Sequence, residues 1–351
     1  MLRLIWSLLL TVTVGLDHSF MCATVSAAAC LQDARLQEAA SQSLPVTAIA
    51  LSTDEKLLLI ANHQGLAIRE IPGEPKDELR AFEADQISAL EFSPNGSLLA
   101  VAGGTPGQFG LVEILEWPVC KRSVINRDFD EVCTAIAWSP DGRYVAAGCH
   151  DSTIRVLDVA TGNTAAKIES HSRAITGLVW TTMEDRPDSG TVLISSSLDQ
   201  SIRLFAPTTT ETGISISPLR ALNQHTREVQ GIAVAGSKQR FQNDRLTLVS
   251  WGDDRTLRFW QPLTGRMMRF AKLESDVVDA VWGGSGRFVI AALANGEIVA
   301  VSMETAAVAP FPRFDQPIAK LTFRTSTDQL IASDFRGQIH FRSAPQTPQG
   351  N

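Results

Sequence analysis

An internal repeat constrains this chain more than any other feature. Seven segments begin with an alternating apolar run, whose last residue falls at positions 51, 92, 138, 180, 234, 282 and 323. After a turn, each segment continues with a second apolar run, and most add a short polar turn and a third run. The segments cover residues 46–71, 87–117, 132–158, 175–205, 229–260, 278–301 and 318–341.

The runs are predicted to be β-strands because they alternate with a period of two and are rich in β-branched residues. Pro-Asp-Gly at 140–142 and Asn-Gly at 95–96 favour hairpin turns. Three strands and a weaker fourth, repeated about every 45 residues, are typical of propeller blades. We therefore predict an all-β fold, a seven-bladed β-propeller of four-stranded antiparallel blades over residues 30–343, with a polar tail at 344–351.

The length of 351 residues would by itself suggest two domains. Seven blades of about 45 residues use about 315 of them and leave no room for a second domain. The seventh repeat has only three runs, so its outer strand must come from elsewhere. Residues 31–38 match the run that precedes the fourth blade (ARLQE against AAKIE). We expect the ring to be closed by this N-terminal strand.

The N-terminus resembles an export signal. Arg3 precedes an apolar run at 4–16 and a small-residue stretch at 26–29, which is typical of a secretory signal peptide at 1–29. A buried first helix is the alternative. Export predicts a periplasmic or extracellular protein, with no transmembrane segment in the mature chain. Cys30 follows small residues as at a bacterial lipoprotein cleavage site, so a lipid anchor there is a second possibility.

The fifth repeat carries the residues of a known family. His225, Ser250, Asp254 and Trp260 stand at the positions of the structural hydrogen-bond tetrad of WD-repeat β-propellers, and residues 31–342 resemble that family. The resemblance implies that these side chains support the blade. The fourth repeat keeps His171, Ser197 and Asp199 with Phe205 at the Trp position, and the third keeps Asp151.

Patterns for other chemistry are missing from the sequence. The net charge of −7 argues against a nucleic-acid partner, which requires a basic face. There is no HExxH, CxxC or CxxCH pattern, and His63, His150 and His340 lie apart from any such spacing. We predict no catalytic residue, no metal and no cofactor.

Two cysteines share the third repeat. Cys133 and Cys149 fall on its first and second strands, and the turn at 140–142 places them opposite each other. Opposed residues at non-hydrogen-bonded sites lie about 4.5 Å apart at Cα, which permits a disulfide. The alternative is that both are small buried apolar side chains.

Partner-binding residues are expected before the first strand of each blade. These positions include Glu131, Arg173, Arg227 and Asp276, and the resemblance implies that such rim positions contact peptides. Arginine binds a carboxylate through two parallel hydrogen bonds, which favours Arg173 and Arg227. The opposite face is the alternative, because it collects long insertions at 181–190, 206–218 and 236–245.

These observations predict a non-catalytic protein-interaction scaffold of the bacterial cell envelope. The propeller would be monomeric and would present loops to a protein or peptide partner. One alternative is a lactonase-like propeller hydrolase with a metal in the central channel. Another is a lipid-anchored envelope assembly factor.

Overall fold

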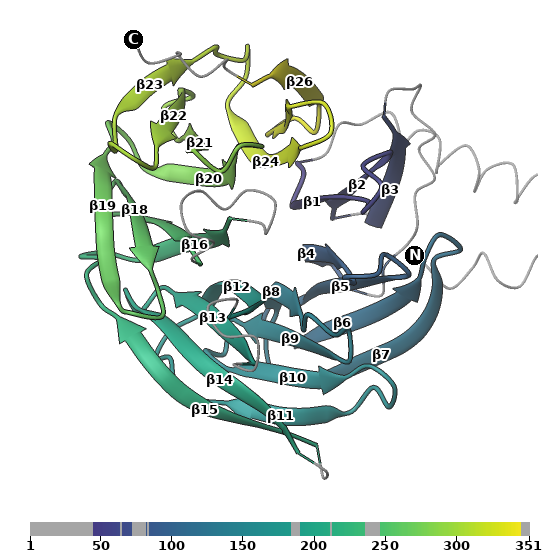
Figure 1. The fold of residues 1–351 in the computed structure, drawn as a ribbon. Helices are drawn as coiled ribbons and strands as arrows, with labels where there is room; N and C mark the ends of the chain where they lie inside the picture. The colour runs from purple at the N-terminus through teal and green to yellow at the C-terminus, as the bar shows by residue number, and fades with distance from the viewer. Residues whose placement is uncertain are drawn as a thin grey trace, which may run out of the picture. The chain divides into compact units, whose positions relative to one another are not determined.

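The computed structural model describes residues 45–63, 65–71, 82, 84–183, 190–210, 213–235 and 246–344. These residues belong to one compact unit, Leu44–Asn351. All secondary-structure elements in this part of the chain are β-strands. They form seven antiparallel sheets that follow one another round a ring (Figure 1). The fold is a seven-bladed β-propeller, as the repeat predicts. The predicted signal peptide, Cys30 and the segment 31–38 lie outside the described residues.

Each blade is a meander of consecutive strands, with the first strand innermost. Blade one contains β1 (Ala48–Leu51), β2 (Leu57–Asn62) and β3 (Gly65–Glu70). Blade two contains β4 (Gln86–Phe92), β5 (Leu98–Thr105), β6 (Phe109–Glu116) and β7 (Lys121–Phe129). Blade three contains β8 (Cys133–Trp138), β9 (Tyr144–Cys149), β10 (Ile154–Asp158) and β11 (Thr164–Ile168). Blade four contains β12 (Ile175–Thr182), β13 (Thr191–Ser197), β14 (Ile202–Thr210) and β15 (Gly213–Leu222).

The remaining three blades repeat the same order. Blade five contains β16 (Val229–Val234), β17 (Leu248–Gly252), β18 (Thr256–Gln261) and β19 (Arg266–Lys272). Blade six contains β20 (Val277–Trp282), β21 (Phe288–Leu293), β22 (Ile298–Ser302) and β23 (Val308–Phe311). Blade seven contains β24 (Ile318–Arg324), β25 (Gln329–Asp334) and β26 (Ile339–Ser343). Blades one and seven have three strands among the described residues, so the addition of residues 31–38 as the outer strand of blade seven stays a prediction.

Apolar side chains between neighbouring sheets form the core, and tryptophans at the ends of inner strands connect one blade to the next. Trp138 at the end of β8 donates its indole N–H to the carbonyl of Glu91 in blade two at 3.0 Å. Trp282 at the end of β20 does the same to Ala233 in blade five at 3.2 Å. Both tryptophans are buried. Large rings at these positions therefore fill the space between blades while their polar N–H groups keep a partner.

One predicted loop is a ladder of paired strands instead. Residues expected to form a long insertion at 206–218 extend β14 and β15, with Ala206 opposite Ser217 and Thr210 opposite Gly213. The segment is rich in β-branched Thr and Ile, which favour extended backbone. The predicted insertions at 181–190 and 236–245 lie partly or wholly outside the described residues.

Blade one packs directly against blade seven and closes the ring within the described chain. Ile331 of β25 lies in one buried cluster with Leu58 and Ile60 of β2, and Phe341 packs against the same cluster. Polar contacts reinforce this seam. The Glu55 carboxylate accepts hydrogen bonds from the backbone N–H of Thr325 at 3.1 Å, from that of Ser326 at 2.8 Å, and from the Thr325 hydroxyl.

Glu55 makes these contacts from an unfavourable backbone conformation. Its φ is +56°, in the left-handed region where the matching turns of blades two and three have Gly96 and Gly142, both with φ +71°. A side chain in this region costs about 1 kcal/mol. Blade one therefore tolerates a strained glutamate at a glycine position, where its carboxylate reaches blade seven.

We expect Glu55→Ala to weaken the seam. Alanine keeps a Cβ at the same positive φ, so the variant removes the carboxylate without relieving the backbone. The free energy of unfolding at pH 7 should fall by about 1 kcal/mol, a modest value because the turn faces solvent. The control is Glu304→Ala, which removes an exposed glutamate from the turn between β22 and β23.

The loss should also depend on pH. Partial burial pulls the pKa of Glu55 upward, but hydrogen bonds from Ser326 and Thr325 outweigh this effect and lower the pKa below 4.5. The stabilisation is complete above that ordinary value and disappears as pH falls through the lower pKa of the folded protein. Thermal melts of wild type and Glu55→Ala should converge in acid. Equal melting temperatures at pH 7 would show that the contacts are not stabilising.

Candidate functional site

A buried hydrogen-bond network supports one face of blade five. His225 Nδ1 lies 2.9 Å from Asp254 Oδ2, and His225 Nε2 lies 2.8 Å from the Ser250 hydroxyl. The Trp260 indole donates to that hydroxyl at 2.8 Å. Burial acts to raise the pKa of Asp254, but hydrogen bonds from His225 and Thr256 outweigh it and hold the pKa well below its usual range. The network is satisfied internally, which fits a structural role.

Blade four has a shorter form of the network, with a different serine from the one predicted. His171 Nδ1 lies 2.8 Å from Asp199 Oδ2, but its Nε2 lies 2.7 Å from Ser195, not Ser197. The Ser197 hydroxyl donates to the carbonyl of Arg173 at 2.9 Å. Ser195 stands four residues before Asp199, as Ser250 stands four residues before Asp254. Phe205 is buried at the Trp position and supplies no donor.

Other blades hold their aspartates differently. In blade three, Asp151 pairs with Arg155 at 3.0 Å, and the Arg155 guanidinium lies over the ring of Phe129. In blade seven, His340 Nε2 lies 2.9 Å from Asp334 Oδ2. His340 is outside any metal-binding spacing in the sequence but has an aspartate as its neighbour in the fold, because β26 brings it beside the end of β25.

The four predicted partner-binding residues lie before the first strands, but most have partners within the chain. Arg173 donates to Glu228 at 2.7 Å and to the carbonyl of Leu198 at 3.0 Å. Glu131 accepts from the backbone N–H groups of Gly107 and Val132 at 3.2 and 3.3 Å. Their charges are thus partly used to hold neighbouring turns in place.

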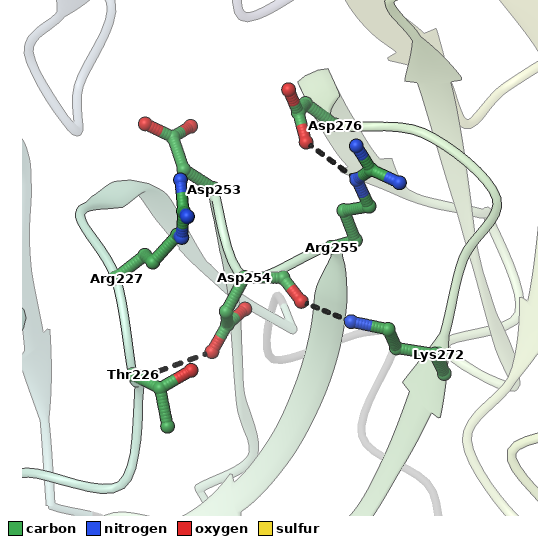
Figure 2. Close-up of a pocket in the computed structure, with 7 residues that line it drawn as sticks. All are labelled: Thr226, Arg227, Asp253, Asp254, Arg255, Lys272 and Asp276. Atoms are coloured by element: carbon green, nitrogen blue, oxygen red, sulfur yellow. Dashed lines mark hydrogen bonds and ion pairs between the residues drawn. The ribbon is translucent and has the colours of Figure 1, made fainter.

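Arg227 and Asp276 come together at one pocket of about 380 Å³ (Figure 2). Its lining residues belong to the turns before β16 and β20, the turn between β17 and β18, and the end of β19. They are Thr226, Arg227, Asp253, Asp254, Arg255, Lys272 and Asp276. Arg173 and Glu131 are not part of this lining.

The charges in this pocket are unequally engaged. Arg255 pairs with Asp276 at 3.2 Å, and Lys272 donates to the backbone carbonyl of Asp254 at 2.6 Å. Asp253 accepts from the Gln230 amide at 2.9 Å. In Figure 2, Arg227 extends from the turn that also carries Thr226, and no dashed line joins it to another residue drawn, whereas a dashed line joins Arg255 to Asp276. Among the described residues the exposed Arg227 guanidinium has no hydrogen bond or ion pair.

A second cavity, also of about 380 Å³, lies along the inner strands. Two acids face it, Glu91 from β4 and Asp279 from β20, together with Lys320 from β24. Asp279 accepts from the backbone N–H of Leu321 at 2.8 Å, so it links blade six to blade seven. Burial raises the pKa of Asp279. Burial also raises the pKa of Glu91 to about 8, although a hydrogen bond from the backbone N–H of Trp138 acts to lower it.

We expect Glu91→Gln to become increasingly stabilising as pH rises. Between pH 4.5 and about 8, the carboxyl is ionised in the unfolded chain but protonated in the folded one. Wild-type stability therefore falls across that range, whereas a glutamine contributes no such dependence. Melting temperatures of the two proteins should be similar at pH 5, and the variant should be higher at pH 8.5. A constant difference at both pH values would contradict the raised pKa.

Metal and membrane features are not found in the described residues. No group of three or more His, Cys, Asp or Glu side chains there could hold a metal ion. No helix in the same part of the chain is long and apolar enough to cross a membrane. Glu131 and Asp276, the two acids that precede first strands, lie on different blades, and each contacts its own partners.

The chain is similar to WD-repeat proteins. The family described as the anaphase-promoting complex subunit 4 WD40 domain matches residues 117–183. WD repeat-containing protein VIP3 of Arabidopsis thaliana is 28% identical over 111 residues, 29% of this chain and 35% of that protein. Cell division cycle 20.1, cofactor of APC complex, from Arabidopsis thaliana is 24% identical over 196 residues, 44% of this chain and 41% of that protein.

A solved structure supports the same fold. A chain of the crystal structure of the mitotic checkpoint complex matches with a TM-score of 0.70 and 15% identity, over 87% of this chain and 91% of that chain. The chain spans less than half the length of these two curated relatives. Together with the repeat and the hydrogen-bond networks, these similarities support a WD-repeat propeller.

Proposed function

We propose that the protein is a non-catalytic interaction scaffold that binds a carboxylate of a protein partner at Arg227. The main supporting observation is the exposed Arg227 guanidinium, which makes no hydrogen bond or ion pair within the described residues, although its charge helps to lower the pKa of Glu228. The other charged side chains named at this pocket have such partners. Arginine binds carboxylates through two parallel, charge-assisted hydrogen bonds. Arg173, Glu131 and Asp276 lie before other first strands and would contribute to the surrounding contact surface.

The pocket suits binding better than catalysis. Each of its aspartates already accepts a hydrogen bond or forms an ion pair, so none has a carboxylate free to act as a general base. The relatives include proteins whose names describe membership of assemblies, such as a cofactor of the APC complex. The proposed scaffold is a monomer with no nucleic-acid partner and no cofactor.

We further propose that this scaffold works in the bacterial envelope after export. The support is the N-terminal sequence, with Arg3 before an apolar run and small residues before Cys30. The mass of the mature N-terminus from the native cell tests this proposal. A chain beginning near Cys30 is expected, and an added acyl mass on Cys30 would instead indicate the lipid-anchored assembly factor. An intact Met1 would contradict export.

Arg227→Glu should abolish binding of the protein partner. The variant reverses the charge without touching the buried network, so a carboxylate would be repelled. The tagged full-length protein is purified from its native cells after cross-linking, and partners are quantified by mass spectrometry. We expect a loss of at least tenfold of one or more partners that wild type retains.

Two matched variants make this experiment specific. Arg269→Glu makes the same charge change at an exposed residue of β19 that does not line the pocket, and should retain the partner. Thr208→Arg alters the opposite face, where a groove of about 640 Å³ lies beside β14. A partner that is lost with Thr208→Arg but kept with Arg227→Glu would overturn the assignment of the binding face.

A further inference from the structure

Two cysteine side chains face each other inside blade three. Cys133 opens β8 and Cys149 ends β9, and the two residues are paired in register. Their Sγ atoms lie 3.0 Å apart. Both residues are fully buried, and the structure holds them as free thiols. The two sulfurs therefore contact each other, in a place that solvent does not reach.

The backbone fixes this pairing. Trp138 lies opposite Val145, one residue further along β9 than a regular ladder from the cysteine pair would place its partner. A bulge between Cys133 and Ala135 makes up this difference, so that Cys133 lies opposite Cys149. Beyond the pair, the His150 N–H donates to the carbonyl of Val132 at 3.0 Å. Hydrogen bonding continues on both sides of the cysteines, so neither can move away without opening the hairpin.

The surroundings leave space for sulfur and separate the pair from Cys120, the other cysteine among the described residues. Cys133 and Cys149 belong to the apolar cluster between blades two and three. A Cβ at Gly110 of β6 would lie 3.0 Å from the Cys133 Sγ, so the glycine leaves room for it. Cys120 lies in a different cluster, between blades one and two.

We propose that Cys133 and Cys149 form a cross-strand disulfide when the protein folds in an oxidising compartment. The oxidant is a small-molecule disulfide such as oxidised glutathione. One cysteine thiolate attacks it, forms a mixed disulfide and releases one glutathione thiolate. The second cysteine thiolate attacks the cysteine sulfur of the mixed disulfide, which forms the Cys133–Cys149 bond and releases the second glutathione. The two protons from the cysteines pass to the released thiolates, and two electrons pass to glutathione.

The bond should form during folding and not in the finished ring. Burial raises the pKa of the Cys133 thiol well above its usual value, and the thiolate is the attacking species. The closed blade therefore resists exchange, whereas the open hairpin exposes both thiols before the neighbouring blades cover them. This inference needs an oxidising medium but is independent of the Arg227 pocket.

Peptide mapping tests the proposal on the wild-type chain. The full-length protein is unfolded with a reductant, refolded with a mixture of oxidised and reduced glutathione, alkylated under denaturing conditions and digested with trypsin. Cleavage after Arg127, Arg143 and Arg155 places the two cysteines in separate peptides, 128–143 and 144–155. We expect these peptides to be cross-linked before reduction and separate after it.

Cys120 is the internal control, since its peptide should be alkylated and not linked to either of the others. The oxidised protein should also melt roughly 5 °C or more above the reduced one. The disulfide closes the loop between the two cysteines and so lowers the conformational entropy of the unfolded chain. Cys120→Ala should keep this shift and Cys149→Ala should abolish it. Complete alkylation of both cysteines, or glutathione left on either one, would overturn the proposal whether or not the variants fold.

Discussion

The packing of blade one against blade seven is the contact on which the rest of the ring depends. Every other pair of neighbouring blades is consecutive in the sequence. Blades one and seven are not, and within the described residues their contacts join segments from opposite ends of the ring-forming chain. Ile331, Leu58 and Ile60 supply the apolar part of this seam. A ring that failed to close here would expose an apolar face on each side, with strand edges available for other chains. The strained Glu55 is consistent with this demand, since it places a carboxylate across the seam.

The sequence predicted the architecture well because its signal is physical and repeated. Alternation with a period of two, followed by turn residues, occurs seven times, so an error in one repeat does not change the result. Details that depend on register were harder to predict. Ser195 and Ser197 are two residues apart on β13 and point to the same side of the sheet, so composition cannot choose between them. The four-residue spacing to the aspartate, shared with blade five, would have selected Ser195.

The candidate site shows where sequence reasoning stops. Arg173 and Arg227 have equivalent positions in successive repeats, yet Arg173 forms an ion pair with Glu228, whereas Arg227 makes no hydrogen bond or ion pair within the described residues. The difference depends on which side chains the neighbouring blade brings near, and no local pattern records this. Arg255 and Lys272 were missed for the same reason, because their roles come from turns that meet only in the folded ring. The cysteine pair was easier to predict, since both residues belong to one hairpin.

The buried network of blade five holds the turns that carry the candidate site. Asp254 holds the backbone N–H of Thr226 at 3.1 Å, directly before Arg227, and also fixes the turn that carries Asp253 and Arg255. Blade four has a shorter network, while blade three relies on an arginine. A ligand at blade five would thus meet groups that are already ordered and would lose little conformational entropy on binding. The backbone on either side of the proposed binding residue is therefore held in place before any ligand arrives.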